Sequence, residues 1–555
     1  MNISTNIVSS LEKCKYDSSV SSYFRLDKLT ALLGEHINFQ LIFEFSDLGD
    51  WNREIKITAN SDLGNIRLRR VKDVCITFDS YPSDPSRGTA KMLDYGNAYP
   101  DILEELENGT NTRATNMLTA IWADVTVPDT AEPGEHEITL EISYKDEIVA
   151  RERVTIDAIG VCLPEGDYKN TMWFHVDCLS SYYDVPVYSE RHWEIIENYM
   201  KNAVENSINT ILVPVLTPPL DTAVGHERPT TQLVRVRRTE QGKYEFGFEL
   251  LDRYIALCKK VGVKYFEISH LFSQWGAKYA PKVMAEVFED GEWREKRIFG
   301  WDTPGTEGEY PLFLAAFIPS LREHLVTLGI LENCIFHISD EPNLETVEGY
   351  KKAKAIVAPL LAGLKVVDAC SHAEFAAEGI IENPIPTDTD MDGFLALDLP
   401  ERWTYYCCVQ TDNAPNRFIC YPSFRNRILG IIMYKFGISG FLQWAYNFYY
   451  TCGSVSMINP YTDASGDGWV PAGDTFMVYP GRDGKPVESL RLPVFAEAFS
   501  DLMALKKCEE LCGRDAVLAV IDRECQITFK NYPANNDYIL KTRAEIGEMI
   551  KNAMK

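Results

Sequence analysis

The chain has 555 residues, of which 45% are hydrophobic, and 55 Lys and Arg against 81 Asp and Glu give a net charge of −26. This length excludes a single small module, and the negative charge disfavours nucleic acids and anionic membrane surfaces as partners. No apolar run approaches the roughly 18 residues of a membrane span, and the N-terminal stretch lacks the apolar core of a signal peptide. We therefore expect a cytoplasmic globular protein.

The cysteine and histidine patterns give no sign of a metal or disulfide framework. The fourteen Cys are scattered without a Cys-x-x-Cys pair, and the nine His include no His-Glu-x-x-His spacing. Reduced thiols are the simplest interpretation, and we expect neither a metal site nor another cofactor.

Residues 1–165 are predicted to form a β-sandwich. Several short segments in this part alternate apolar and polar residues between Gly, Pro, Asn and Asp, without a convincing helix among them. These segments span residues 36–45, 53–59, 118–127, 136–144 and 150–161. The turn-rich stretch LPEGDYKN, residues 163–170, marks the end of this unit.

The period of the pattern then changes, and residues 166–505 are predicted to form a catalytic (β/α)8 barrel. Apolar strand candidates lie at residues 172–178, 210–216, 263–272, 334–342, 364–370, 393–399, 405–410 and 440–447, and amphipathic helix candidates lie at 189–206, 248–262, 311–329, 344–362 and 424–437. Strands buried on both faces and separated by helices are typical of a parallel sheet covered by helices, and eight of them fit a closed barrel. The link between 393–399 and 405–410 is too short for a crossover helix, so either the barrel is irregular or one strand is misassigned.

The last part of the chain continues this unit. A long loop rich in aromatic residues and Gly follows residue 447, and a helical segment closes the barrel. Residues 506–555 are predicted to form a helical tail packed on the barrel.

Polar residues end most of the predicted strands. In a barrel of this kind the active site lies at the carboxyl ends of the strands. Carboxylates and aromatic rings in such a rim suit a carbohydrate, whose apolar face packs on Trp or Tyr and whose hydroxyls need polar partners. The residues concerned are His175, Asp177, His270, Trp275, Ser339, Asp340, Glu341, Asp368, Asp398, Tyr405, Tyr406, Trp444, Tyr446 and Asn447.

The segment FHISDEPN, residues 336–343, is the most informative of these strand ends. It delivers the adjacent carboxylates Asp340 and Glu341 to the barrel mouth, and Pro342 then stops the strand. Two like charges this close raise the pKa of one of them, leaving an acid beside an ionised partner, as glycoside hydrolysis requires. The alternative is that Asp340 or Asn343 only caps the next helix.

Three stretches together resemble the glycoside hydrolase family 123 β-N-acetylgalactosaminidases and their relatives. These are FHISDEPN, FRNRILGIIMYKFGISGFLQWAYN and VYPGRDGKPVESLRL, and the similarity spans roughly residues 170–505. The resemblance implies a retaining, substrate-assisted mechanism, an exception to the usual pair of catalytic carboxylates. Asp340 would accept a hydrogen bond from the acetamido N–H and stabilise an oxazolinium-like intermediate, and Glu341 would be the general acid and then the base.

This assignment makes a structural prediction. Neighbouring side chains on a regular strand point to opposite faces. We therefore expect a bulge or a turn out of strand geometry at Asp340 and Glu341.

Each of the other substrate-binding candidates could instead have a purely structural role. His175 and Asp177 would share a face of the first strand and bind sugar hydroxyls, or form a satisfied polar cluster beneath the site. Trp275 and Trp444 would form a sugar platform or a wall around the acetamido methyl, or simply pack in the core. His270 ends the third predicted strand.

Further candidates concern the acetamide and charged sugars. Tyr405 and Asn447 are candidates for binding its carbonyl and N–H. Arg235, Arg237 and Arg238 are best interpreted as a solvated loop, although a sulfated or sialylated sugar could use them.

Two other functions stay open. One is a glycosidase with a protein nucleophile, which would pair Glu341 with Glu267 or Asp398. The other is a catalytically inactive carbohydrate-binding protein on the same scaffold. In all three cases the partner is a small saccharide or glycoconjugate, expected to end in an N-acetylhexosamine and to be imported into the cell, and neither nucleic acid nor membrane is expected to bind.

Overall fold

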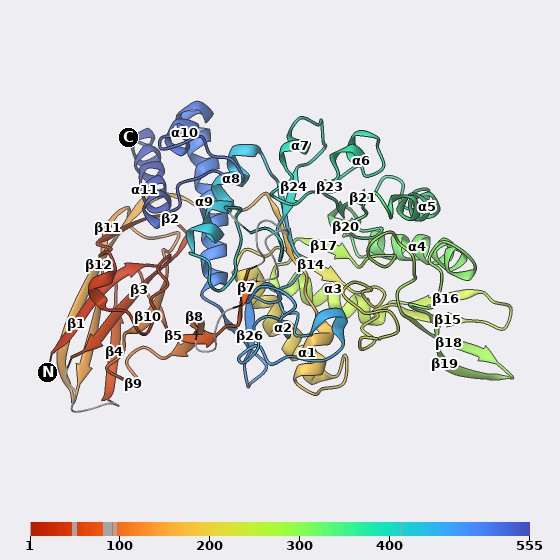
Figure 1. Ribbon diagram of the computed structural model, residues 1–555, viewed down its shortest axis with the longest axis horizontal. Helices are drawn as coiled ribbons and strands as arrows, with labels where there is room; N and C mark the ends of the chain where they lie inside the picture. The colour runs from red at the N-terminus through yellow and green to blue at the C-terminus, as the bar shows by residue number, and fades with distance from the viewer. Residues whose placement is uncertain (1, 47–52, 81–90, 93–96, 412) are drawn as a thin grey trace.

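The computed structural model describes residues 2–46, 53–80, 91–92, 97–411 and 413–555. Two N-terminal β-sheets lie at one end of the long axis, a parallel sheet surrounded by helices lies in the middle, and a small outlying sheet lies at the other end (Figure 1). Helix α9 (Arg491–Cys512) lies between the N-terminal sheets and the parallel sheet, and the last two helices lie beside it at the upper edge of the molecule (Figure 1).

The two N-terminal sheets, here called the N-terminal sheet pair, have five strands each. The first has the order β1 (Ile3–Ser9), β3 (His36–Phe45), β10 (Thr119–Thr126), β5 (Ile66–Cys75) and β8 (Ala98–Leu106), and the second has the order β2 (Lys28–Leu33), β12 (Glu147–Cys162), β11 (Gly134–Tyr144), β4 (Arg53–Asn60) and β9 (Asn111–Ala114). A further two-stranded sheet pairs β6 (Phe78–Ser80) with β7 (Lys91–Met92).

The alternating sequence pattern explains this pair of sheets. On β4, Ile55, Ile57 and Ala59 are buried while the residues between them are wholly or partly exposed, as expected for a strand with one buried face. They share one hydrophobic core with residues of the other sheet such as Phe39 and Leu41 of β3. All five segments predicted as strands in this part of the chain are confirmed.

The central parallel sheet has seven strands, and every pairing that connects them is parallel. Their order is β21 (Lys365–Val366), β20 (Cys334–Phe336), β17 (Tyr265–Ile268), β14 (Thr210–Val213), β13 (Lys169–Met172), β25 (Gly440–Gln443) and β24 (Trp403–Tyr405). The sheet is curled (Figure 1).

A short parallel pair, β22 (Asp368–Ala369) and β23 (Pro384–Ile385), links the two edge strands of this sheet. β22 follows β21 after one residue, and Thr387, just beyond β23, forms a parallel bridge with Tyr405 of β24.

Three predicted strands need correction. The segment at 393–399 is not a strand, because Asp392–Leu395 forms the short helix α7, and the strand in that part of the chain is instead β23. The strand predicted at 405–410 ends at Tyr405. The first predicted strand, 172–178, ends at Met172, and Val176–Tyr182 is helix α1. In so short a segment, a continuous apolar run is compatible with either a buried strand or a buried helical turn.

The helices alternate with the parallel strands, and the five that were predicted are confirmed. They are α2 (Glu190–Glu205), α3 (Glu249–Val261), α4 (Glu309–Thr327), α5 (Val347–Val357) and α8 (Phe424–Phe436), while α6 (Ala373–Ala377), α9 (Arg491–Cys512), α10 (Arg514–Ile521) and α11 (Asn536–Ala553) complete the set. Among the described residues, no helix combines the length and apolar character needed to cross a bilayer.

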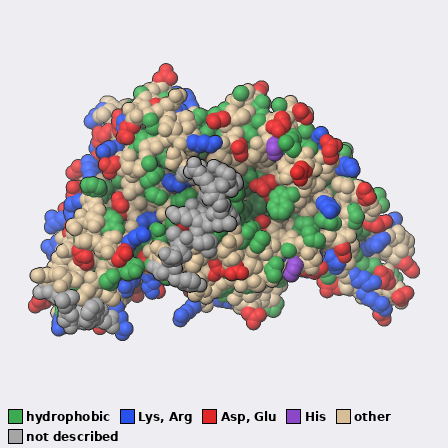
Figure 2. Space-filling model, in the orientation of Figure 1, with side chains coloured by type: hydrophobic (Ala, Val, Ile, Leu, Met, Phe, Trp, Pro, Cys, Tyr) green, Lys and Arg blue, Asp and Glu red, His purple; other side chains and the backbone are tan. Residues whose placement is uncertain are grey.

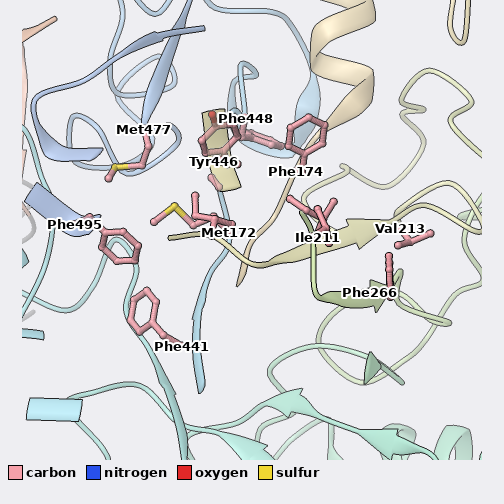
Figure 3. Packing of buried hydrophobic residues seen from close by; sticks show 14 of the residues in the cluster. Met172, Phe174, Ile211, Val213, Phe266, Phe441, Tyr446, Phe448, Met477 and Phe495 are labelled. Atoms are coloured by element: carbon pink, nitrogen blue, oxygen red, sulfur yellow. The ribbon is translucent and has the colours of Figure 1, made fainter. Parts of the chain in front are cut away.

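Apolar side chains from neighbouring parallel strands pack together beneath these helices. In Figure 3, Ile211, Val213 and Phe266, from β14 and β17, lie on one side of Met172 of β13, and Phe441 of β25 lies on the other side. These side chains are 3% exposed or less, which anchors the strand ends that carry the polar residues.

A four-stranded outlying sheet has no counterpart in the predictions. Its order is β16 (Tyr244–Gly247), β15 (Arg235–Arg238), β18 (Val283–Glu289) and β19 (Glu292–Phe299). Two shorter elements, β26 (Val478–Pro480) and β27 (Pro486–Glu488), pair in the long loop after β25.

Buried ion pairs join the N-terminal sheet pair to the following part of the chain. Asp101 of β8 accepts two hydrogen bonds from Arg491 of α9, at 2.9 and 3.1 Å, and one of 2.6 Å from the Tyr479 hydroxyl. Glu488 binds Arg69 of β5, and, although burial alone would raise its pKa, Arg69 and Arg67 lower the pKa of Glu488 to about 2. Both buried carboxylates are therefore paired with arginine, and Glu488 is charged.

Helix α11 and α9 also tie the two parts together. Arg543 of α11 donates to Glu35, and Glu497 of α9 accepts hydrogen bonds from Ser10 and Asn38. The proposed boundary at 505/506 falls within α9, and α11 packs on both α9 and the N-terminal strands β2 and β12.

Candidate active site

Asp340 and Glu341 lie in an irregular segment that follows β20. The strand ends at Phe336, and Glu341 has a φ of +43°, in the left-handed region that non-glycine residues rarely adopt. Its backbone N–H donates to the carbonyl of Ala369 at 3.1 Å. The expected turn out of strand geometry is confirmed, and it allows adjacent carboxylates to lie near each other.

Capping and the carboxylate pair do not compete, because Asn343 supplies the local cap. Its Oδ1 accepts hydrogen bonds from the N–H groups of Glu345 and Thr346, at 3.0 and 3.1 Å, just before α5. Asp340 and Glu341 therefore need not satisfy the helix end.

Two aromatic side chains hold the Glu341 carboxylate. The Tyr405 hydroxyl donates to Oε1 at 2.5 Å, and the Trp275 indole N–H donates to Oε2 at 3.4 Å. Burial and the charge of Glu341 raise the pKa of Tyr405 well above its usual value, so its hydroxyl keeps its proton and remains a donor. Tyr405 and Trp275, which were predicted to bind substrate, thus both contact Glu341, the predicted general acid.

Trp275 is presented by a strained turn. Trp275, Gly276 and Ala277 all have positive φ, at +57°, +104° and +58°. The Trp275 N–H donates to the Asp340 carbonyl at 2.8 Å, and a Cβ on Gly276 would lie 2.7 Å from Cβ of Thr346. This close approach explains the glycine, and the turn and the Asp340 segment position each other.

The electrostatics of the pair centre on Asp340. Burial, the Glu341 charge and the Asp221 charge raise its pKa well above the usual range, and the nearby His337 opposes that shift. This shift favours a protonated Asp340 in the free protein, which differs from the expected arrangement of an anionic Asp340 beside a protonated acid.

A charged network lies beneath Asp340. His337 donates from Nε2 to Glu267 at 2.7 Å, and its Nδ1 lies 3.5 Å from Asp368. Burial alone would lower the pKa of His337, but Asp368 and Glu267 raise it to about 10, so His337 is a cation. Glu267 also accepts hydrogen bonds from Thr171 and, at 2.9 Å, from Trp173. All its hydrogen bonds are therefore made to buried side chains below the site, and this buried layer is called the floor of the site.

His270 belongs to the same floor. Its ring stacks on His337 with centroids 4.2 Å apart, it is 2% exposed, and its Nε2 has no hydrogen-bond partner. Burial and the His337 charge lower its pKa well below the usual value, so it is neutral. It thus lies under the site without reaching the surface.

In the described part of the chain, one group of side chains has the spacing of metal ligands, namely His270, His337 and Asp368, whose ligand atoms lie within 4.8 Å of one another. Asp368 already accepts from two backbone N–H groups and from Tyr350. In this arrangement Asp368 is thus already used within the protein, and His337 is a cation.

His175 and Asp177 form a satisfied cluster, which was the alternative to sugar binding. They do not share a strand face, because His175 precedes α1 and Asp177 lies in its first turn. Buried Arg228 donates two 2.7 Å hydrogen bonds to Asp177 and one of 3.0 Å to Nδ1 of His175. Burial and Arg228 lower the pKa of His175 to about 3, so it is neutral.

Asn447 is likewise engaged within the protein. Its amide accepts from the His175 N–H at 2.9 Å and donates to the His175 carbonyl at 3.0 Å. Tyr446 points into the core, where its hydroxyl donates to Asn202 at 2.6 Å. The Asn447 side chain is fully buried, and its printed hydrogen bonds are both to the His175 backbone rather than to the site.

Trp444 and Asp474 form another side of the site. The half-buried Trp444 indole donates to Asp474 at 3.0 Å, and burial raises the pKa of Asp474 to about 6. Trp444 also packs against Phe448 and Trp469. It also packs against the core cluster that contains Trp173 and Tyr405, so its contacts are those of the core packing that was the alternative to a role in sugar binding.

Asp221 is a residue that the sequence analysis missed. Its φ is +55°, its N–H donates to Gln274 at 2.6 Å, and its carbonyl accepts from Ser454 at 2.6 Å. Its half-buried carboxylate makes no hydrogen bond among the described residues, and burial and the Glu341 charge raise its pKa to about 7 against the opposing effect of Arg228. A third carboxylate therefore lies near the pair with its hydrogen-bonding capacity unused.

A hollow marks this region of the surface. Figure 2 shows it near the middle of the molecule, over the part where Figure 1 places β14 and β17, with acidic and hydrophobic side chains around it. The loops after these strands carry Asp221 and Trp275.

Comparison with known families shows the family to which this chain belongs. A model of the glycoside hydrolase 123 catalytic domain matches residues 173–508. The chain belongs to glycoside hydrolase family 123. Its expected family is thereby confirmed, and the protein is a glycosidase of that family.

Known structures agree on the fold of this family 123 protein. A family 123 glycoside hydrolase from Clostridium perfringens, described in a study of glycolipid glycan hydrolysis, matches with a TM-score of 0.73 and 14% identity over 100% of this chain and 98% of that one. A GH5 xyloglucanase from Bacteroides ovatus reaches only 0.28, with 8% identity over 85% of this chain and 98% of that one, and supports no inference. No curated protein matches the sequence.

The basic group of this glycosidase lies outside the site. Arg235, Arg237 and Arg238 are on β15 of the outlying sheet and pair with Glu249, Glu286 and Glu309 at 3.4, 2.5 and 3.6 Å. Their side chains are 37–50% exposed, as expected for solvated residues, but they lie on a strand and not in the predicted loop.

Proposed function

We propose that this family 123 glycosidase releases a terminal β-linked N-acetylgalactosamine by a retaining, substrate-assisted mechanism. The observation that carries the proposal is the Glu341 carboxylate, held by Tyr405 and Trp275 beside Asp340 at the mouth of the parallel sheet. The relative from Clostridium perfringens is described as acting on glycolipid glycans, which supports a glycan substrate.

In the first step the acetamido carbonyl oxygen of the substrate attacks the anomeric carbon. The bond from that carbon to the glycosidic oxygen breaks, and the leaving oxygen takes the proton of Glu341. Asp340 accepts the acetamido N–H hydrogen bond, which becomes stronger as positive charge develops on the oxazolinium-like intermediate. Water then attacks the anomeric carbon, gives its proton to Glu341, and opens the intermediate.

Substrate binding places the proton correctly. In the free protein burial favours protonated Asp340. An acetamido N–H that donates to Asp340 stabilises its charged form, so the proton shared by the pair moves to Glu341, where the first step uses it.

We infer the groups that bind the sugar from the side chains near Glu341 that remain after those already used within the protein are set aside. The Asp221 carboxylate accepts hydrogen bonds from sugar hydroxyls. Tyr405 positions Glu341 and reaches the acetamide carbonyl only if it leaves Oε1.

The parallel sheet is proposed to be an irregular (β/α)8 barrel. The pairings run from β13 through β14, β17, β20 and β21, continue by β22 and β23, and return through the bridge from Thr387 to Tyr405 and the β24–β25 pair. This path supports a barrel mouth at the site.

A protein nucleophile has less support. The Glu267 oxygens are occupied in the floor, and Asp398 is exposed in the loop after α7. A binding protein without activity would leave the strained, hydrogen-bonded Glu341 without a purpose.

The test uses nitrophenyl β-N-acetylgalactosaminide and β-N-acetylglucosaminide with wild type, Asp340→Asn and Glu341→Gln. In each variant kcat should fall by a factor of roughly 10² to 10⁴. An N-acetyl-thiazoline analogue should inhibit the wild type competitively. Exposed Asp398→Asn is the matched control and should keep its activity. Full activity in both site variants would reject the assignment.

A further inference from the structure

Two adjacent cysteines follow β24 directly. Cys407 and Cys408 come just after Tyr405, whose hydroxyl binds Glu341, and they are the only two of the fourteen cysteines that are neighbours in the sequence. Both are partly exposed. A side-chain hydrogen bond with Cys408, burial and the charge of Glu341 raise the pKa of the Cys407 thiol well above its usual value. The two thiols are therefore in contact with each other and close to the proposed acid.

The peptide group between the two cysteines is held at both of its polar atoms. Its carbonyl, which belongs to Cys407, accepts a 2.9 Å hydrogen bond from the Asn416 amide. Its N–H, which belongs to Cys408, donates to the carboxylate of Asp474. Asp474 also accepts the 3.0 Å hydrogen bond from the indole of Trp444. The orientation of this one peptide therefore affects both the end of β24 and the position of Asp474.

A disulfide between these neighbours would disturb that peptide. Consecutive Cα atoms are about 3.8 Å apart, whereas the Cα atoms of a disulfide are usually about 4.4 to 6.8 Å apart. Closing the ring must therefore distort the 407–408 backbone, and the hydrogen bonds to Asn416 and Asp474 cannot both keep their present geometry. Strained disulfides are also the ones that are easily reduced again.

We propose that Cys407 and Cys408 are a redox modification site, which a peroxide closes to a disulfide and a reducing dithiol reopens, and that closure switches the glycosidase off. This inference rests on the proposed function, because the distortion begins two residues after Tyr405, the residue that positions Glu341. A displaced acid loses the alignment on which its proton transfer depends.

The chemistry takes two steps. Because the thiolate is the reactive form and Cys407 is held as a thiol, hydrogen peroxide oxidises Cys408 first, which gives a sulfenic acid and one water. The Cys407 sulfur then attacks the Cys408 sulfur, the S–S bond forms, and a second water leaves. Overall the two thiols lose two protons and two electrons, and hydrogen peroxide is reduced to water.

The experiment follows activity and disulfide together. Reduced wild type is treated with hydrogen peroxide and then with dithiothreitol, and kcat is measured at each stage with nitrophenyl β-N-acetylgalactosaminide. The tryptic peptide 403–417 contains both thiols and no other cysteine, so closure lowers its mass by two hydrogen atoms. The variants are Cys407→Ser and Cys408→Ser. The matched control is Cys162→Ser, because Cys162 is an exposed thiol at the end of β12.

Peroxide should lower kcat of wild type by roughly tenfold to a hundredfold, in step with closure of the peptide, and dithiothreitol should restore it. Cys407→Ser and Cys408→Ser should keep their activity under the same treatment. Cys162→Ser should lose and regain activity as wild type does.

A second measurement needs no variant. Phenylarsine oxide bridges two neighbouring thiols through its arsenic atom and releases its oxygen as water. It should modify peptide 403–417 in the reduced protein and not in the oxidised one. The inhibition that results should be reversed by a dithiol and not by a monothiol.

Three results would overturn the proposal. They are a peptide that stays open under peroxide, a closed peptide with undiminished activity, and a loss of activity that persists in either serine variant. If reduced wild type hydrolysed no nitrophenyl glycoside, the proposed function would fail instead. The peptide mass and the arsenical would still decide whether the dithiol closes, so the two failures are distinguishable.

Discussion

The Tyr405 hydroxyl donates a 2.5 Å hydrogen bond to Oε1 of Glu341. This bond joins the end of β24 to the segment after β20, on strands that are not neighbours in the parallel sheet. The bond therefore fixes the position of the Glu341 carboxylate.

Tyr405→Phe should lower kcat by roughly tenfold to a hundredfold, because the Glu341 carboxylate loses the hydrogen bond that positions it. The rate is measured with a nitrophenyl substrate at saturating concentration, and urea unfolding checks that the variant is folded. An unchanged kcat would show that this hydrogen bond does not position Glu341 for the reaction.

Asp340→Asn should move the alkaline limb of the kcat/KM profile, measured with a nitrophenyl substrate between pH 4 and 9, to lower pH. Wild type should give a bell-shaped profile whose two limbs belong to the pair. With one carboxylate removed, the remaining proton leaves a site without a like charge beside it and is lost at lower pH. Residual activity of the variant is sufficient for the measurement, and a limb that stays in place would contradict the coupling.

Glu267→Gln separates a floor residue from a nucleophile. Because cationic His337 would lose a buried partner, the free energy of unfolding should fall by about 3–5 kcal/mol, while kcat of the folded protein stays within roughly tenfold. Urea unfolding and active-site-normalised rates measure both. A folded variant that is inactive but rescued by azide would instead identify Glu267 as a nucleophile.

Asp221→Asn should stabilise the protein increasingly as pH rises from 5 to 8. The pKa of Asp221 is about 7 in the folded state, above its ordinary 3.8, so charging this group costs stability between those values. The Asn variant avoids this cost, and the gain should be about 1 kcal/mol because the half-buried group is partly screened by solvent. Urea unfolding at four pH values measures it, and a gain independent of pH would refute the shift.

Asp101→Asn tests the contact between the N-terminal sheet pair and α9. It leaves the buried Arg491 without its carboxylate and should cost about 3–5 kcal/mol of unfolding free energy. The control is Glu194→Gln, which breaks an exposed pair with Arg191 and should cost less than about 1 kcal/mol. Equal losses in the two variants would contradict the role of burial.

The sequence predicted elements well wherever the pattern was long. Residues 36–45 and 424–437 match β3 and α8 within one residue, because ten or more residues carry a clear period. The two-residue β23 has no such run, and its partner β22 is equally short. The strand was therefore assigned to 393–399, where an apolar helical turn lies.

The site was predicted in its acid but not in its surroundings. The pair at 340–341 and Trp275 were found because they lie in the segments that follow strands, and Tyr405 was found because it lies at a strand end. Asp221 follows the run TILVPVL and could have been found by the same rule. Asp474 could not, because it lies in the long loop after β25, and only tertiary packing brings it to Trp444. Asn447 and His175 were predicted to bind sugar, but a sequence does not reveal that two residues will satisfy each other.

The buried pairs between the N-terminal sheet pair and α9 have a consequence for how this protein can be divided. The family match covers residues 173–508, yet that fragment would keep Arg491 and Glu488 while losing Asp101 and Arg69. Each would then be a charge facing a partner that no longer exists. The two parts are therefore expected to be stable only together, and a foreign sheet domain could replace the native one only if it supplied the same charges at the same places.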